Sequence, residues 1–307
     1  MPPHRLSHRR ALVILGLVVL AWGVNWPITK TIVREVSPLW STALRCAIAA
    51  IALGALLWMR GQFIVPKRGD MPVVLSTSLL HMSAYSALVA AGLQALPVGR
   101  AIVLGYTTPI WVMIGARIVL GERITTGKAI GVGTGLAGLA VIFSPASLDW
   151  GDRHALAGTG LIMLAAFCWA ANIVYVRAHR WISSPFQLAF WQVGLACVVL
   201  SATAAAVDGV PHVDWTFHLA GLLLFSGLVC TALAYWAMSV ANRSLPAVTT
   251  SLGLLATPAL GIVSGVVLLG EPLEPSLLAA LALLLGGIAI GMADDRRKAA
   301  KAGDGIP

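Results

Sequence analysis

Ten apolar runs, each close to the length that a helix needs to cross the hydrocarbon core of a bilayer, make up most of the sequence. Inside hydrocarbon only α-helices and closed β-barrels pair every backbone N–H and C=O, and these runs are about twice as long as a barrel strand. The chain is therefore predicted to be an all-α integral membrane protein. The ten expected transmembrane helices cover residues 11–32, 38–58, 72–95, 97–120, 128–145, 157–178, 186–207, 216–241, 246–269 and 275–293.

The composition agrees with burial in lipid and excludes several other classes of protein. Hydrophobic residues make up 58% of the 307 residues and charged residues only 11%, against about 25% in an ordinary globular domain. The net charge of +9 needs no nucleic-acid partner, because the basic residues lie in the short gaps between apolar runs. The four cysteines lie inside apolar runs without Cys-x-x-Cys spacing, so neither a disulfide framework nor a metal site is expected. We also expect no cofactor.

Several marks in the first half of the sequence return in the second half at a nearly constant distance. The offset is 147 residues for the leading marks and 149 for the trailing ones. The matching positions are Trp22 and Trp169, Asn25 and Asn172, Ser37-Pro38 and Ser184-Pro185, Thr108-Pro109 and Thr257-Pro258, and Gly121-Glu122 and Gly270-Glu271. An internal repeat of this length predicts one five-helix unit over residues 1–148 and a second over 149–295, followed by a basic tail over 296–307.

An odd number of helices in each unit means that the second unit enters the membrane from the opposite side, so the repeats are predicted to be inverted. Loop charge sets the orientation: sixteen Lys and Arg residues lie on the side of both termini and four on the other side. Both termini are therefore expected in the cytoplasm. The first run extends to Ile32 without a small-residue cleavage site, which favours a retained first span over a cleaved signal peptide.

These marks resemble those of the drug/metabolite transporter superfamily, in its EamA-type exporter branch. The resemblance rests on Trp22-Gly-Val-Asn25, on its echo Trp169-Ala-Ala-Asn172, and on the repeated Thr-Pro and Gly-Glu pairs, and it extends from about Ala11 to Met292. It implies an inner-membrane carrier that exports small metabolites by alternating access. Within the branch the chain is similar to bacterial aromatic amino-acid exporters, which implies amino acids, aromatic ones included, as substrates.

The sequence contains no Gly-x-x-x-x-Gly-Lys-Ser/Thr phrase to cradle ATP, so transport is expected to run on a gradient. Small multidrug members of the superfamily use a glutamate in the first helix to exchange protons; here that helix offers Asn25 and no acid. We therefore expect facilitated flux, with proton-coupled export of other amphipathic compounds as the alternative. A multi-pass enzyme is disfavoured, because the spans hold no acid. No obligatory protein partner is indicated.

The polar and aromatic residues placed deep in the spans are the candidate substrate-binding residues. Trp22 and Trp169 each lie three residues before an asparagine on the same helix face, and His81 lies about 14 Å into its helix. Packing at helix crossings is the competing interpretation of the tryptophans. The predicted substrate-binding set is Trp22, Asn25, His81, Tyr85, Tyr106, Trp169, Asn172 and Gln192.

Two prolines and three charged residues in or beside the spans have predicted roles of their own. Pro109 and Pro258 fall near the middle of their runs, where each is expected to bend the helix and form a hinge, with a static kink shaped for packing as the alternative. Thr108 and Thr257, or cavity water, are expected to pair the freed carbonyls. Arg45 is either an anchor bonded to backbone carbonyls or a contact for a substrate carboxylate. Glu122 and Glu271 each follow a helix-ending glycine and are expected to cap helices at the membrane faces.

The predicted topology can be checked by cysteine accessibility in intact cells. We expect a cysteine placed beside Gly121-Glu122 to be shielded from an impermeant reagent, because this site is predicted to face the cytoplasm. A cysteine beside Gly270-Glu271 should be labelled, because the inverted repeat places it on the outer face. Equal labelling at both sites would contradict the inverted repeat.

Overall fold

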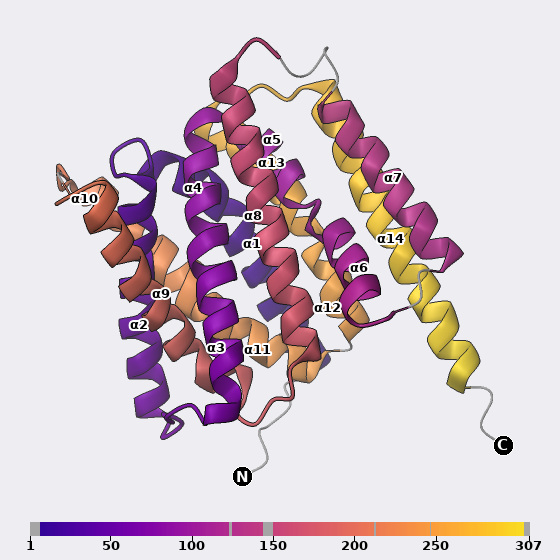
Figure 1. Ribbon diagram of the computed structural model, residues 1–307, viewed down its shortest axis with the longest axis horizontal. Helices are drawn as coiled ribbons and strands as arrows, with labels where there is room; N and C mark the ends of the chain where they lie inside the picture. Colours follow the sequence, from indigo (N-terminus) through magenta and orange to yellow (C-terminus); the bar gives the residue numbers. More distant parts are fainter. Residues whose placement is uncertain (1–6, 123–124, 144–149, 212, 246, 304–307) are drawn as a thin grey trace.

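The computed structural model describes residues 7–122, 125–143, 150–211, 213–245 and 247–303, and within them the regular secondary structure is helical throughout (Figure 1). Eight helical segments are long and apolar enough to cross a membrane, and two shorter apolar helices, Thr126–Ile142 and Ala256–Leu269, belong to the two remaining predicted spans. The all-helical fold with ten spans in duplicated halves is thus confirmed. The predicted boundary between the halves, at 148 and 149, lies outside the described residues.

The first half contains five spans, of which the third and fourth are built from several helical pieces. They are α1 (His8–Ile32); α2 (Pro38–Met59); η1 (Arg68–Asp70), α3 (Met71–Ser76), η2 (Thr77–Tyr85) and α4 (Ser86–Ala95); α5 (Val98–Gly105) and α6 (Thr108–Val119); and α7 (Thr126–Ile142).

The second half repeats this order of continuous and divided spans. They are α8 (Arg153–Ala178); α9 (Pro185–Val207); α10 (Phe217–Leu224), η3 (Phe225–Leu233) and α11 (Ala234–Ser244); α12 (Ala247–Leu254) and α13 (Ala256–Leu269); and α14 (Pro275–Gly303). The last helix continues through Gly303, beyond the end predicted near residue 293, so part of the basic tail is helical.

The repeated Ser-Pro pair marks the start of the second helix in each half. Ser37 accepts a hydrogen bond from the amide of Trp40, and Ser184 accepts one from the amide of Gln187 in a full capping box. The proline that follows each serine occupies the first turn, where its missing N–H has no partner to lose. The repeat therefore preserves helix starts as well as apolar runs.

The third and eighth spans each contain a π-helix, η2 and η3, at matching places in the repeat. A π-helix widens the turn and leaves backbone groups out of the usual pairing, and it is often found at functional sites. A hydroxyl five residues further on helps to pair the backbone in each case: Ser86 donates to the carbonyl of His81 at 3.3 Å, and Thr231 donates to the carbonyl of Ser226 at 2.9 Å. The sequence pattern does not predict these π-helices.

The sequence predicts that the two repeated prolines bend continuous helices. The structure differs, because each proline lies just after a point where its span is interrupted. α5 ends at Gly105 and α6 begins at Thr108, so Pro109 lies in the first turn of a new helix, and Pro258 is likewise the third residue of α13. The Thr108 hydroxyl donates to the Gly105 carbonyl at 2.7 Å, which confirms the predicted pairing in the first half, whereas within the described residues the Thr257 hydroxyl makes no such bond to the Leu254 carbonyl. Whether the breaks act as hinges stays a prediction.

Among the described residues one acid, Asp70, is fully buried, and it ties the two halves together at the end of the bundle where the third span begins. Asp70 accepts hydrogen bonds from the amides of Ile182 and Ser183 at 3.1 and 2.9 Å, and the His179 ring lies 3.3 Å away. Three partners satisfy a buried carboxylate that would otherwise be costly to remove from water.

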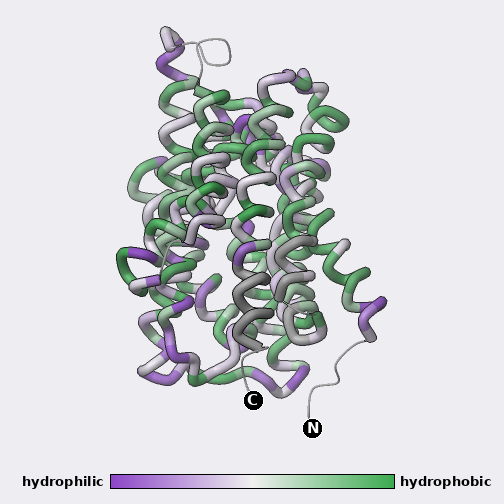
Figure 2. Tube along the Cα trace, turned by 90° about the vertical axis from the view of Figure 1, so that its right-hand side faces the viewer, coloured by the Kyte–Doolittle hydropathy of each residue, from purple (hydrophilic) through white to green (hydrophobic). Residues whose placement is uncertain are grey.

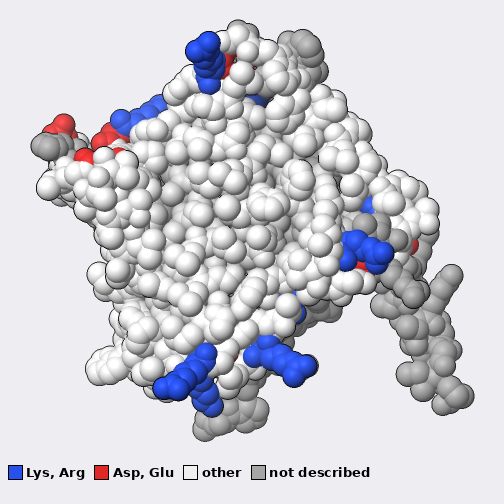
Figure 3. Space-filling view, viewed as in Figure 1, with Lys and Arg blue, Asp and Glu red and all other residues white. Residues whose placement is uncertain are grey.

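The surface is divided into an apolar middle and more polar ends, as expected for a protein in a bilayer. Figure 2 shows most of the hydrophilic residues towards the two ends of the bundle. Figure 3 shows that the middle of one face lacks charged side chains, which gather along its margins. Large apolar side chains such as Ile51, Ile118 and Val267 are more than 70% exposed, as lipid contact requires.

The fifth and tenth spans, α7 and α14, pack as a close pair at the right of Figure 1. Glycines allow their backbones to meet: a Cβ added to Gly131 would lie 2.5 Å from the Gly287 carbonyl oxygen. Close approach through small residues is the usual way in which helices associate in membranes, where no hydrophobic driving force exists between them.

This contact predicts a difference between two glycines of α7. Gly131→Ala should lower the melting temperature of the purified protein by several degrees, because the new methyl group forces the helices apart at a cost of about 1–3 kcal/mol. Gly133→Ala is the control, since a Cβ there meets nothing within 4 Å. A thermal unfolding assay in detergent compares them, and equal melting temperatures for the two variants would contradict the assigned crossing.

Candidate functional site

A cavity of about 160 Å³ lies between the two halves of the bundle. Residues of both halves line it, including side chains of α1, α2, η2 and η3. Six of the eight predicted substrate-binding residues are among them: Trp22, Asn25, His81, Tyr85, Tyr106 and Trp169. The structure thus brings most of the predicted set to one place.

Three aromatic rings from two helices form one wall of the cavity. The His81 and Trp169 rings are stacked, with centroids 5.5 Å apart and planes 10° apart. The Tyr85 ring lies 5.0 Å from Trp169 and 5.5 Å from His81. His81 and Tyr85 both belong to η2, so the irregular turn of that helix helps to place them beside Trp169 of α8.

A second aromatic group comes from α1 and the eighth span. Trp22 meets Tyr235 edge to face, with ring centroids 6.3 Å apart. The Trp22 indole N–H donates to the Cys230 carbonyl of η3 at 3.0 Å, so a polar group of the π-helix is paired by a side chain of the cavity. Asn25 accepts a hydrogen bond from Ser226 at 2.8 Å and joins the same two elements.

The two remaining predicted residues, Asn172 and Gln192, do not line this cavity. Asn172 is buried and accepts a hydrogen bond from Ser76 at 3.1 Å, which joins α8 to α3 just as Asn25 joins α1 to η3. Gln192 is buried within α9. Sequence equivalence predicts equal roles for repeat partners, but the halves adopt different conformations around the cavity and contribute unequally.

Several lining residues are not predicted from the sequence, namely Trp26, Ser226, Cys230 and Thr231. Three of them lie on η3, whose wider turn shifts side chains relative to an α-helix. In the sequence, these lining residues could be found only from the spacing of small polar residues in an otherwise apolar run. That spacing is not one of the repeated marks.

Arg45 of α2 also lines the cavity. Within the described residues it makes no hydrogen bond to a carbonyl and no ion pair. The carbonyl hydrogen bond that the anchor interpretation predicts is thus not found among the described residues, and the choice between the two roles stays a prediction. No Asp or Glu lines the cavity, so the local charge is positive.

A second hollow, of about 450 Å³, adjoins the first and shares Tyr106 and Trp169 with it. It passes between α6, α7 and α14 and reaches Glu122, Lys128 and Arg177. Tyr106 and Trp169 therefore lie between the central cavity and a hollow at the end of the bundle that carries Glu122, which we call the Glu122 end.

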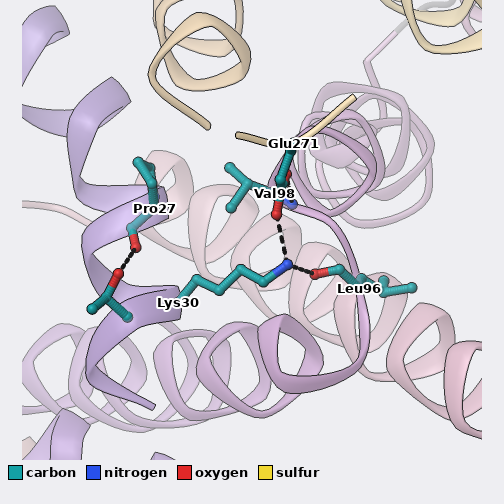
Figure 4. Close-up of polar contacts among 6 residues, drawn as sticks. Pro27, Lys30, Leu96, Val98 and Glu271 are labelled. Carbon is teal, nitrogen blue, oxygen red and sulfur yellow. Dashed lines mark hydrogen bonds and ion pairs between the residues drawn. The ribbon is translucent and has the colours of Figure 1, made fainter. Parts of the chain in front are cut away.

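At the opposite end of the bundle, which we call the Glu271 end, a buried network of polar contacts joins the two halves (Figure 4). Lys30 of α1 pairs with Glu271 at 2.6 Å and donates to the Leu96 carbonyl at 2.8 Å, while the other Glu271 oxygen accepts the amide of Val98 at 2.7 Å. Glu271 thus stabilises the N-terminus of α5, a helix of the other half, rather than the helix that follows it.

The matching acid, Glu122, has a more exposed arrangement. Its partner is Arg177, the repeat equivalent of Lys30, at 2.5 Å. The side chains of this pair are 46% and 35% exposed, against 14% for both members of the buried pair. Both acids follow a glycine with positive φ, 67° at Gly121 and 66° at Gly270, as the sequence predicts.

Two repeats of membrane-spanning helices, with a largely aromatic cavity between them and irregular backbone beside it, define a membrane carrier. The chain belongs to the EamA-like transporter family, whose model matches residues 9–144 and again residues 156–292. The double match agrees with the duplicated halves. The family is one of transporters, which confirms that the chain is not an enzyme, and it makes the protein a multi-pass membrane protein with a small-molecule substrate.

Individual relatives are distant but extend over nearly the whole chain. The chain is 27% identical to an uncharacterized transporter, YoaV, of Bacillus subtilis, covering 90% of this chain and 95% of the relative. It is 25% identical to a probable amino-acid metabolite efflux pump of Salmonella typhimurium, covering 90% and 92%. A solved crystal structure at 21% identity has a TM-score of 0.64 and covers 95% of this chain and 99% of that one, which shows the shared fold.

Proposed function

We propose that the protein exports amino acids, including aromatic ones, across the inner (plasma) membrane by alternating access, with both termini in the cytoplasm. The observation that carries the proposal is the aromatic wall formed by His81, Tyr85 and Trp169 in a cavity between the repeats. Flat rings about 5 Å apart favour another flat ring as their ligand, because aromatic groups pack edge to face or offset at such distances.

Two further observations support an amphipathic substrate. The lining combines these rings with amide and hydroxyl groups, such as Asn25 and Tyr106, which can orient a polar head group. The Salmonella relative is named as an amino-acid metabolite efflux pump, which is consistent with this substrate class at 25% identity.

We further propose that the substrate moves down its own gradient. A proton-driven carrier needs a group in the transport path that gains and loses a proton, and embedded carboxylates are the usual means. The cavity has no acidic lining residue, and His81 is the one imidazole among its lining residues. Accumulation of substrate driven by a proton gradient alone would contradict facilitated flux.

The substrate assignment predicts a selective effect of Trp169→Ala. In proteoliposomes of the wild-type protein, phenylalanine and valine should both move when a substrate gradient is imposed. Trp169→Ala should reduce phenylalanine flux about tenfold and valine flux much less, because the lost contact scales with buried ring area. Trp58→Ala is the matched control, since the Trp58 side chain is 76% exposed and lies outside the cavity.

An equal loss on both substrates with a lower melting temperature would show that Trp169 packs the bundle and does not select the substrate. Failure of the wild-type protein to move any amino acid would overturn the proposed function itself.

A further inference from the structure

Arg45 is the one Lys or Arg among the lining residues of the central cavity, and no described residue neutralises it. Arg45 is half-buried, and removing a charge from water without a partner is costly, more so within a membrane, where such residues mark substrate paths. Its repeat partner Gln192 is neutral and lies outside the cavity, so the charge belongs to one wall alone.

Arg45 supplies the one permanently charged donor among the residues that line the cavity. Ser41 and Thr42 line the cavity one turn earlier on α2, but their hydroxyls donate to the Pro38 carbonyl at 3.0 and 2.7 Å. A planar guanidinium binds a carboxylate through two parallel hydrogen bonds, a geometry that no other side chain of the cavity offers.

We propose that Arg45 binds the carboxylate of the transported molecule and so restricts the substrates to carboxylates with a flat apolar body. The inference rests on the proposed function, because it takes the central cavity as the substrate site. An ammonium group on the substrate is tolerated but does not recruit the site, since no acidic residue lines the cavity to receive it. Amines without a carboxylate are rejected, because they place a second positive charge beside Arg45.

Three compounds with the same ring test the carboxylate and the ammonium separately in proteoliposomes. They are phenylalanine, which has both groups, 3-phenylpropionate, which lacks the ammonium, and 2-phenylethylamine, which lacks the carboxylate. Phenylalanine and 3-phenylpropionate should each inhibit flux of the other, and 2-phenylethylamine should inhibit neither. Arg45→Met should weaken inhibition by both carboxylates about tenfold or more, the usual loss for a hydrogen bond to a charged group. Arg60→Met is the matched control, because Arg60 caps the same helix outside the cavity, over the Trp236 ring.

Equal inhibition by 2-phenylethylamine and 3-phenylpropionate in the wild type would overturn the role of Arg45, and this result needs no variant to fold. Unchanged carboxylate inhibition in Arg45→Met would also overturn it. If no amino acid moves, the proposed function fails, and a thermal shift with 3-phenylpropionate then decides this inference separately: a shift lost in Arg45→Met supports it, and no shift contradicts it.

Discussion

The need to pair every backbone N–H and C=O inside hydrocarbon is the constraint on which this structure depends. It makes the spans helical, and it allows irregular backbone only where side chains or a cavity complete the pairing. The π-helix η3, the hydroxyl of Thr231 and the indole of Trp22 form one such arrangement, because the side chains pair carbonyls of the widened turn. The cavity therefore occurs where the regular helix gives way.

Two halves built from one repeated plan carry unequal shares of the site. Asn25 and Asn172 both accept a serine hydroxyl from the other half, which preserves the tie between halves, yet only Asn25 reaches the cavity. The acids after the helix-ending glycines differ in the same way, one buried against a helix N-terminus and one exposed. A single conformation of an inverted repeat need not be symmetric. The differences between equivalent residues of the two halves characterise the conformation described here.

Much of the fold can be predicted from the sequence, because span length, repeat offset and glycine positions follow from local chemistry. The ring cluster of His81, Tyr85 and Trp169 is also predictable, since costly polar residues deep in spans gather around a common space. The π-helices are not, because a shift from four-residue to five-residue pairing leaves the apolar pattern intact. The exclusion of Asn172 depends on tertiary packing, which no local pattern reports.

The network at Glu271 also sets an order on assembly during synthesis. Lys30 and the first amide of α5 belong to the first half, but their partner lies 241 and 173 residues further along the chain. While the second half is still being synthesised, the Lys30 ammonium and the N-terminus of α5 lack the Glu271 carboxylate that pairs with them. The first half is therefore incomplete as a unit until the ninth span has entered the membrane, and docking of the halves is the step that finishes both.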